Sequence, residues 1–179
     1  MKDNTVKITF CGVLSALATA LMLLSYFPYF TYVVPAVSGV VMLVVLIELG
    51  HKWAWATYAV TAVLSFVFAE PEAKLMFVLF LGFYPIIKAY IEKLRSRALQ
   101  YLIKFAVFNT SVFAVYVLLA NAFGIYLGDV IGRGAVFIAL LLVLANVTFY
   151  LYDIVLVRTA NFYIFRLHVR ISGILRIKK

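Results

Sequence analysis

The stretch VKITFCGVLSALATALMLLSYF, residues 6–27, decides the class of this protein. It carries almost no charge and is about as long as the roughly 20 apolar residues that a helix needs to cross a bilayer. Similar runs recur along the chain, whose 179 residues are 66% hydrophobic and only 13% charged. A soluble domain normally has about 25% charged residues. The sequence therefore predicts an all-α integral membrane protein.

Six apolar runs are long enough to be read as spans, and they cover residues 6–27, 33–49, 53–69, 75–91, 101–123 and 135–157. The fourth run contains Pro85, which a transmembrane helix tolerates as a kink if another group bonds the freed carbonyl. The expected fold is a six-helix transmembrane bundle, residues 1–157, followed by a cytoplasmic tail, residues 158–179. In the tail, basic residues alternate with apolar ones, which is typical of a segment lying on a membrane surface.

The distribution of basic residues predicts the orientation. The formal charge is +9, yet the basic residues lie between and beyond the apolar runs, as membrane topology requires, and do not indicate a nucleic-acid partner. With a cytoplasmic N-terminus, only Lys74 and Arg133 of the 16 Lys and Arg residues fall outside. We therefore expect a multi-pass protein of the cell membrane with both termini in the cytoplasm.

Recognisable catalytic signatures are missing from the sequence. There is no paired-histidine metal motif, no phosphate-binding glycine loop and no nucleophile elbow, and His51 and His168 are far apart. The single cysteine, Cys11, has no partner for an internal disulfide. We expect no enzyme activity, no metal and no cofactor.

Several ionisable residues lie near the predicted inner ends of the spans. Glu48 precedes Lys52, Lys88 precedes Glu92, and Asp153 lies close to the end of the sixth span. The members of each pair are four residues apart, which is the spacing of neighbours on one helix face. We interpret these residues as anchors at the cytoplasmic face, with a coupling role as the alternative.

Polar and aromatic residues at the outer end predict a site for a small-molecule substrate. Loops over a helical bundle can bring such groups together around a ligand. The candidate substrate-binding residues are Tyr32, Glu70, Glu72, Lys74, Asn121, Tyr126, Asp129 and Arg133. Two deeper amides, Asn109 and Asn146, could contact the ligand or instead join two helices through hydrogen bonds.

The first span has small residues at every fourth position: Gly12, Ala16 and Ala20. They form a flat strip that another helix can approach closely. We predict that this strip is a partner interface, with packing inside the bundle as the alternative.

With these features the chain resembles the substrate-binding S components of energy-coupling-factor transporters, which capture vitamins or related micronutrients for an ATP-driven module. The resemblance covers the six spans, the cytoplasmic ends and a small-x-x-x-small motif at Ala16 and Ala20. It implies that these alanines dock against a transmembrane scaffold subunit, and that separate ATPase subunits supply the energy. The third span has alanines but no clear second motif. The sequence also has no vitamin-specific signature, so the identity of the substrate stays open.

A second interpretation is a scaffolding subunit similar to the rod-shape-determining six-helix family. Such a protein needs partner proteins but no small ligand. An intramembrane enzyme is a third class, but the sequence offers no nucleophile or metal cluster for it.

Overall fold

The computed structural model describes residues 2–123 and 134–166, and every regular element in these ranges is helical. The all-α prediction is thereby confirmed for this part of the chain. The elements are α1 (Lys2–Leu23), η1 (Leu24–Tyr26), α2 (Val33–Leu49), α3 (His51–Phe68), α4 (Pro71–Met76), η2 (Phe77–Leu81), α5 (Tyr84–Ile91), α6 (Arg97–Phe123) and α8 (Ala135–Arg166).

Four helical stretches among the described residues are long and apolar enough to cross a membrane. They are Asn4–Tyr26, Pro71–Ile91, Arg97–Asn121 and Val136–Arg166. The α2 helix is apolar but has only 17 residues. The α3 helix is not among the four, because it begins with His51 and Lys52 and contains several Thr and Ser residues.

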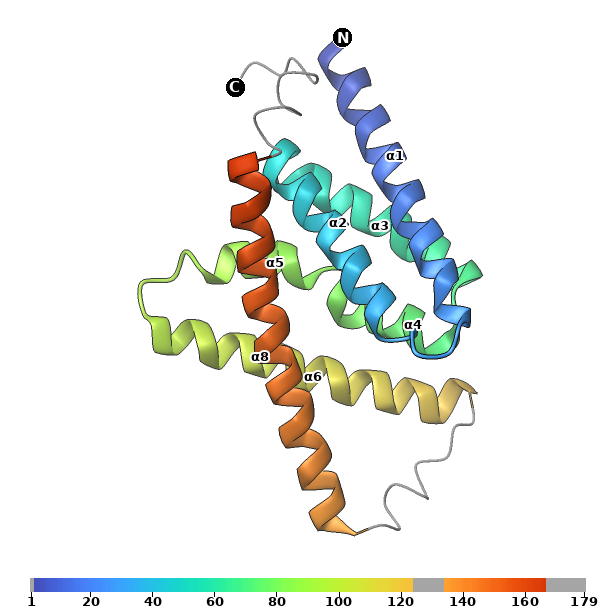
Figure 1. Cartoon of the computed structure of the whole chain (residues 1–179), viewed down its shortest axis with the longest axis vertical. Helices are drawn as coiled ribbons and strands as arrows, with labels where there is room; N and C mark the ends of the chain where they lie inside the picture. Colours follow the sequence, from blue (N-terminus) through green and yellow to red (C-terminus); the bar gives the residue numbers. More distant parts are fainter. Residues whose placement is uncertain (1, 124–133, 167–179) are drawn as a thin grey trace.

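The first three helices pack side by side, with α2 between α1 and α8 (Figure 1). Gly50 separates α2 from α3, and its φ of 85° lies in the left-handed region that favours glycine. The chain can therefore reverse with a single residue between the two helices. Most of the residues of α2 from Val34 to Leu46 are buried, which makes it the central helix of the N-terminal half.

The predicted fourth span is one irregular helix made of α4, η2 and α5. Pro71 starts it, where a missing N–H is harmless. η2 is a short π-helix, in which the Gly82 N–H donates to the Phe77 carbonyl oxygen at 2.8 Å instead of to Val78. The Tyr58 hydroxyl from α3 donates to the Val78 carbonyl oxygen at 2.6 Å.

Pro85 has the effect expected of it. It has no N–H for the carbonyl of Leu81, four residues earlier. The Tyr152 hydroxyl from α8 donates to that carbonyl oxygen at 3.5 Å. The Tyr152 hydroxyl thus meets the condition under which a transmembrane helix tolerates a proline. Tyrosines from two other helices compensate for the irregular backbone.

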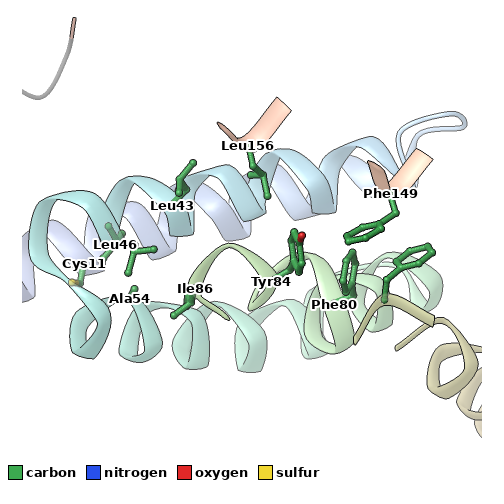
Figure 2. Close-up of a cluster of buried hydrophobic side chains, with 11 residues drawn as sticks. Cys11, Leu43, Leu46, Ala54, Phe80, Tyr84, Ile86, Phe149 and Leu156 are labelled. Carbon is green, nitrogen blue, oxygen red and sulfur yellow. The ribbon is translucent and has the colours of Figure 1, made fainter. Parts of the chain in front are cut away.

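The C-terminal half is organised differently, because α6 lies across α8 in Figure 1 instead of beside it. An aromatic cluster joins η2 and α5 to this crossing. The rings of Phe108 and Phe149 are stacked with centroids 4.6 Å apart, and Phe80 meets both edge-on at 5.2 and 5.6 Å. Figure 2 shows Phe80, Tyr84 and Phe149 at one end of the larger buried cluster.

The last described helix extends past the predicted end of the sixth span. α8 continues to Arg166, so residues 158–166 of the predicted tail belong to that helix. No proline or glycine occurs between residues 157 and 166 to stop it. The remainder of the tail, residues 167–179, lies outside the described residues.

The close approach of α2 to η2 gives a test of the fold. A Cβ on Gly39 would lie 2.3 Å from the Leu81 carbonyl oxygen and 2.7 Å from the Tyr152 hydroxyl. We expect Gly39→Ala to lower the free energy of unfolding in detergent by about 1–3 kcal/mol, the usual cost of overpacking. Gly12→Ala is the control, since nothing lies within 4 Å of its Cβ position. Equal stability of both variants would contradict this packing.

Candidate functional site

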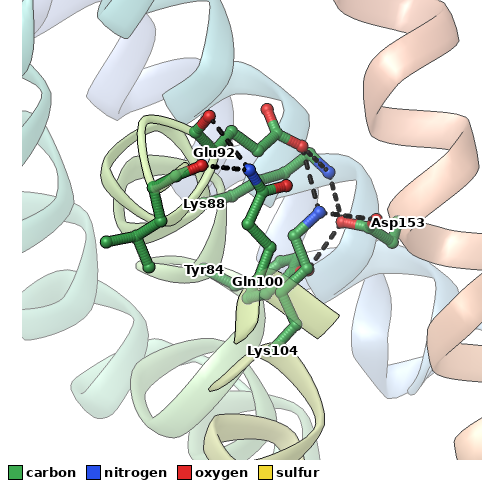
Figure 3. Close-up of polar contacts among 7 residues, drawn as sticks. Tyr84, Lys88, Glu92, Gln100, Lys104 and Asp153 are labelled. Atoms are coloured by element: carbon green, nitrogen blue, oxygen red, sulfur yellow. Dashed lines mark hydrogen bonds and ion pairs between the residues drawn. The ribbon is translucent and has the colours of Figure 1, made fainter. Parts of the chain in front are cut away.

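Three helices bring four charged side chains together. Lys88 comes from α5, Glu92 from the residue after α5, Lys104 from α6 and Asp153 from α8 (Figure 3). We call these four residues the charge network. They span 65 positions of the sequence, so only folding brings them into contact.

In the charge network each ammonium group lies between two carboxylates. Lys104 Nζ is 3.0 Å from both Glu92 Oε1 and Asp153 Oδ2. Lys88 Nζ is 2.7 Å from Glu92 Oε1 and also bonds Asp153 Oδ1. Tyr84 donates its hydroxyl to the same Asp153 oxygen at 2.6 Å. Two positive and two negative charges leave the network formally neutral.

Burial makes this pairing necessary. The side chains of Lys88 and Lys104 are each 6% exposed and that of Asp153 is 10% exposed. A single charge removed from water costs several kcal/mol unless an opposite charge and hydrogen bonds compensate for it. Glu92 is the wetter member, with 42% of its side chain exposed. Burial raises the pKa of Glu92, but Lys88 and Lys104 lower it more, so the carboxyl stays ionised.

The loop after α5 is held by one side chain of α6. Gln100 donates its amide N–H groups to the carbonyl oxygens of Leu94 at 2.7 Å and Glu92 at 3.3 Å. These carbonyls lie where α5 has ended and have no further helical turn to bond them. Gln100 therefore fixes the start of α6, and with it Lys104, relative to Glu92.

A cleft of about 390 Å³ opens beside the charge network, between α6 and α8. We call it the α6–α8 cleft. It is lined by Glu92, Arg97, Gln100, Tyr101, Lys104, Tyr150, Asp153, Ile154, Val157 and Arg158. Its volume falls within the range of about 300–1,000 Å³ that is usual for small-ligand sites.

The predicted outer-end residues are partly brought together. The Thr31 hydroxyl donates to Glu70 Oε2 at 2.9 Å, and the Tyr32 hydroxyl donates to Glu72 Oε2 at 3.0 Å. Burial and the neighbouring Glu72 raise the pKa of Tyr32 to about 12, so this hydroxyl keeps its proton. These bonds join the loop before α2 to the start of α4.

Two further candidates of the predicted outer site, Lys74 and Asn121, donate hydrogen bonds to backbone carbonyl oxygens. Lys74 Nζ donates to the Phe66 carbonyl oxygen at 3.3 Å and lies 5.1 Å from the Phe66 ring. Asn121 donates to Val117 of its own helix at 2.9 Å. Tyr126, Asp129 and Arg133 lie outside the described residues.

The two deeper amides, Asn109 and Asn146, join two helices through hydrogen bonds, which was the second role considered for them. Asn109 Nδ2 donates to Asn146 Oδ1 at 3.0 Å, and Asn146 Nδ2 donates to Asn109 Oδ1 at 3.2 Å. This reciprocal pair joins α6 to α8 at their crossing.

The small-residue strip of α1 faces outward. Gly12, Ala16 and Ala20 are all exposed, whereas Cys11, Ser15 and Ala18 are buried against the rest of the molecule. The strip is thus not used for packing among the described residues.

The sequence identified three members of the charge network but not their association. Lys88 and Glu92 were expected to pair along one helix, and that pair is confirmed. Asp153 was interpreted as an anchor, and Lys104 only as a cytoplasmic-side charge. The available signal was that Lys88, Lys104 and Asp153 all lie inside predicted spans, where ionisable residues usually have partners. No group of His, Cys, Asp and Glu residues in the described part could hold a metal ion.

Comparison with protein-family models, with curated proteins and with solved structures gave no match. Functional inference therefore rests on the geometry of the chain itself.

The charge network predicts a strong effect of removing its shared carboxylate. Asp153→Asn leaves two buried ammonium groups with Glu92 alone, and we expect it to lower the free energy of unfolding by about 3–5 kcal/mol. Adding Lys104→Met should restore part of this loss, because one positive and one negative charge then remain. Glu72→Gln at the outer end is the control. Chemical unfolding in detergent measures all of them, and strictly additive effects of Asp153→Asn and Lys104→Met would contradict the network.

Proposed function

We propose that this protein is a non-enzymatic, membrane-embedded subunit that captures a small micronutrient, a vitamin or a related metabolite, for uptake. A separate transmembrane scaffold subunit and ATPase subunits would supply the energy. The protein would cross the cell membrane six times, with both termini in the cytoplasm.

The observation that carries this proposal is the outward-facing strip of α1. Gly12, Ala16 and Ala20 are exposed, and the Cβ position of Gly12 has open space around it. In a bilayer the small side chains allow another helix to approach closely, and this approach favours association through van der Waals contacts. An exposed strip of this kind is suited to a partner subunit, because the bundle does not use it.

Six spans are supported by four long apolar helices and by the shorter apolar α2. The α3 helix would be the sixth. Its polar residues Thr57, Thr61 and Ser65 are buried, so the face that it presents outward is mainly apolar and suits lipid.

Cysteine labelling tests the six spans. In a Cys11→Ala background, single cysteines at Glu72 and Ser96 should react with a membrane-impermeant thiol reagent from opposite sides. We expect Glu72→Cys to react in intact cells and Ser96→Cys only after the membrane is opened. Reaction of both from the same side would contradict an even number of spans with cytoplasmic ends.

Substitutions on the strip test the docking surface. We expect Ala16→Trp and Ala20→Trp to reduce recovery of co-purifying membrane subunits about tenfold or more, because the bulky ring prevents a close helix crossing. Val143→Trp, at an exposed position of α8 away from the strip, is the control. The variants should keep their thermal stability, since neither alanine is buried. Unchanged partner recovery would overturn the docking role.

A scaffolding role is the second candidate, and the outer end favours it. Glu70 and Glu72 already accept hydrogen bonds from the neighbouring loop, so these carboxylates serve to join two loops. Thermal-shift screening of the same purified protein against vitamins, nucleobases and amino acids separates the two roles. A stabilising compound supports solute capture, whereas partner recovery without any stabilising compound supports a scaffold.

A further inference from the structure

The α6–α8 cleft contains more positive charge than its own carboxylates neutralise. Arg97, Lys104 and Arg158 line it together with Glu92 and Asp153. Both carboxylates are already bonded to ammonium groups, Glu92 and Asp153 each to Lys88 and to Lys104. Their negative charge is therefore already neutralised within the charge network.

The two arginines are the groups left for an incoming ligand. Both side chains are exposed, and no ion pair to either is found among residues 2–123 and 134–166. They approach the cleft from different helices, Arg97 from the first turn of α6 and Arg158 from the C-terminal part of α8. Both carboxylates of the cleft lining are paired with lysines, so neither would strongly repel an anion that binds between the helices.

The chemistry of these side chains favours phosphate. A guanidinium group presents a planar fork of N–H donors that can bind two phosphate oxygens at once, and it stays charged at any physiological pH. The hydroxyls of Tyr101 and Tyr150 are further hydrogen-bond donors in the lining. A phosphate has enough acceptor oxygens for both arginines and a tyrosine together.

The apolar side of the cleft indicates where the rest of the ligand would lie. Ile154 and Val157 belong to the lining, and the adjacent outward residues Leu151 and Val155 are 57% and 51% exposed. An acyl chain can follow such a surface along α8. Basic pockets between helices on the cytoplasmic side of a membrane are suited to anionic lipid headgroups.

We propose that the α6–α8 cleft binds a phosphate group, carried by an anionic lipid or by a soluble phosphate compound, and that Arg97 and Arg158 are its ligands. This site would be separate from the substrate site predicted at the outer end. Residues of the charge network form the inner wall of the cleft, where their positive and negative charges are already paired. The positive charge that attracts the ligand is therefore that of the two arginines.

Thermal-shift titration of the delipidated full-length protein tests this proposal. The probes are a short-chain phosphatidylglycerol, the matching diacylglycerol, which has no phosphate group, and inorganic phosphate. The principal variant is Arg97→Gln/Arg158→Gln, and the control is Lys7→Gln/Lys52→Gln, which removes the same amount of charge away from the cleft. We expect about 30-fold weaker binding of the anionic probe in the principal variant and little change in the control.

Arg97→Lys/Arg158→Lys keeps both charges without the guanidinium fork, and it decides the question if the glutamine variant does not fold. We expect it to weaken binding by an intermediate factor. Stabilisation by phosphatidylglycerol but not by inorganic phosphate identifies a lipid headgroup, and stabilisation by both at similar concentrations identifies a soluble phosphate compound. Equal stabilisation by the two lipids, equal losses in the principal and control variants, or no stabilisation by any probe would overturn the proposal.

Discussion

The described structure depends on the pairing of charges that have been removed from water. Asp153 accepts hydrogen bonds from Lys88, Lys104 and Tyr84, and so holds α5, α6 and α8 at one point. None of these lysines could stay charged in such a buried position without a counter-ion. The crossing of α6 and α8 therefore depends on this network. Removal of any one member would leave another charge buried without its partner.

Buried backbone groups of the predicted fourth span also need polar partners. A π-helical turn and Pro85 together redirect its hydrogen bonds, and the hydroxyls of Tyr58 and Tyr152 donate to carbonyls of this segment. In a bilayer an unbonded carbonyl costs several kcal/mol, so an irregular helix needs donors from its neighbours. Gly39 permits the required approach, because its missing side chain leaves room for the Leu81 carbonyl.

These internal demands also explain which surfaces remain for partners and ligands. The buried face of α1 uses Cys11, Ser15 and Ala18, which leaves its small-residue strip outward. The charge network uses both lysines and both carboxylates of its region, which leaves the arginines of the α6–α8 cleft without an ion pair among the described residues. Gly12, Ala16 and Ala20 on α1, and Arg97 and Arg158 in the cleft, are thus left for partners and ligands by these internal contacts.

The sequence alone determined the helical class, the approximate bounds of the apolar helices, the placement of basic residues between and beyond the apolar runs, and the pairing of Lys88 with Glu92. These properties follow from local composition and from the spacing of neighbours on one helix. Tertiary structure decided that Asn109 joins Asn146, that Lys104 shares Asp153 with Lys88, and that Gly12, Ala16 and Ala20 face outward. No local pattern could supply these contacts, because each depends on how helices distant in sequence cross and on which face of each helix then becomes buried.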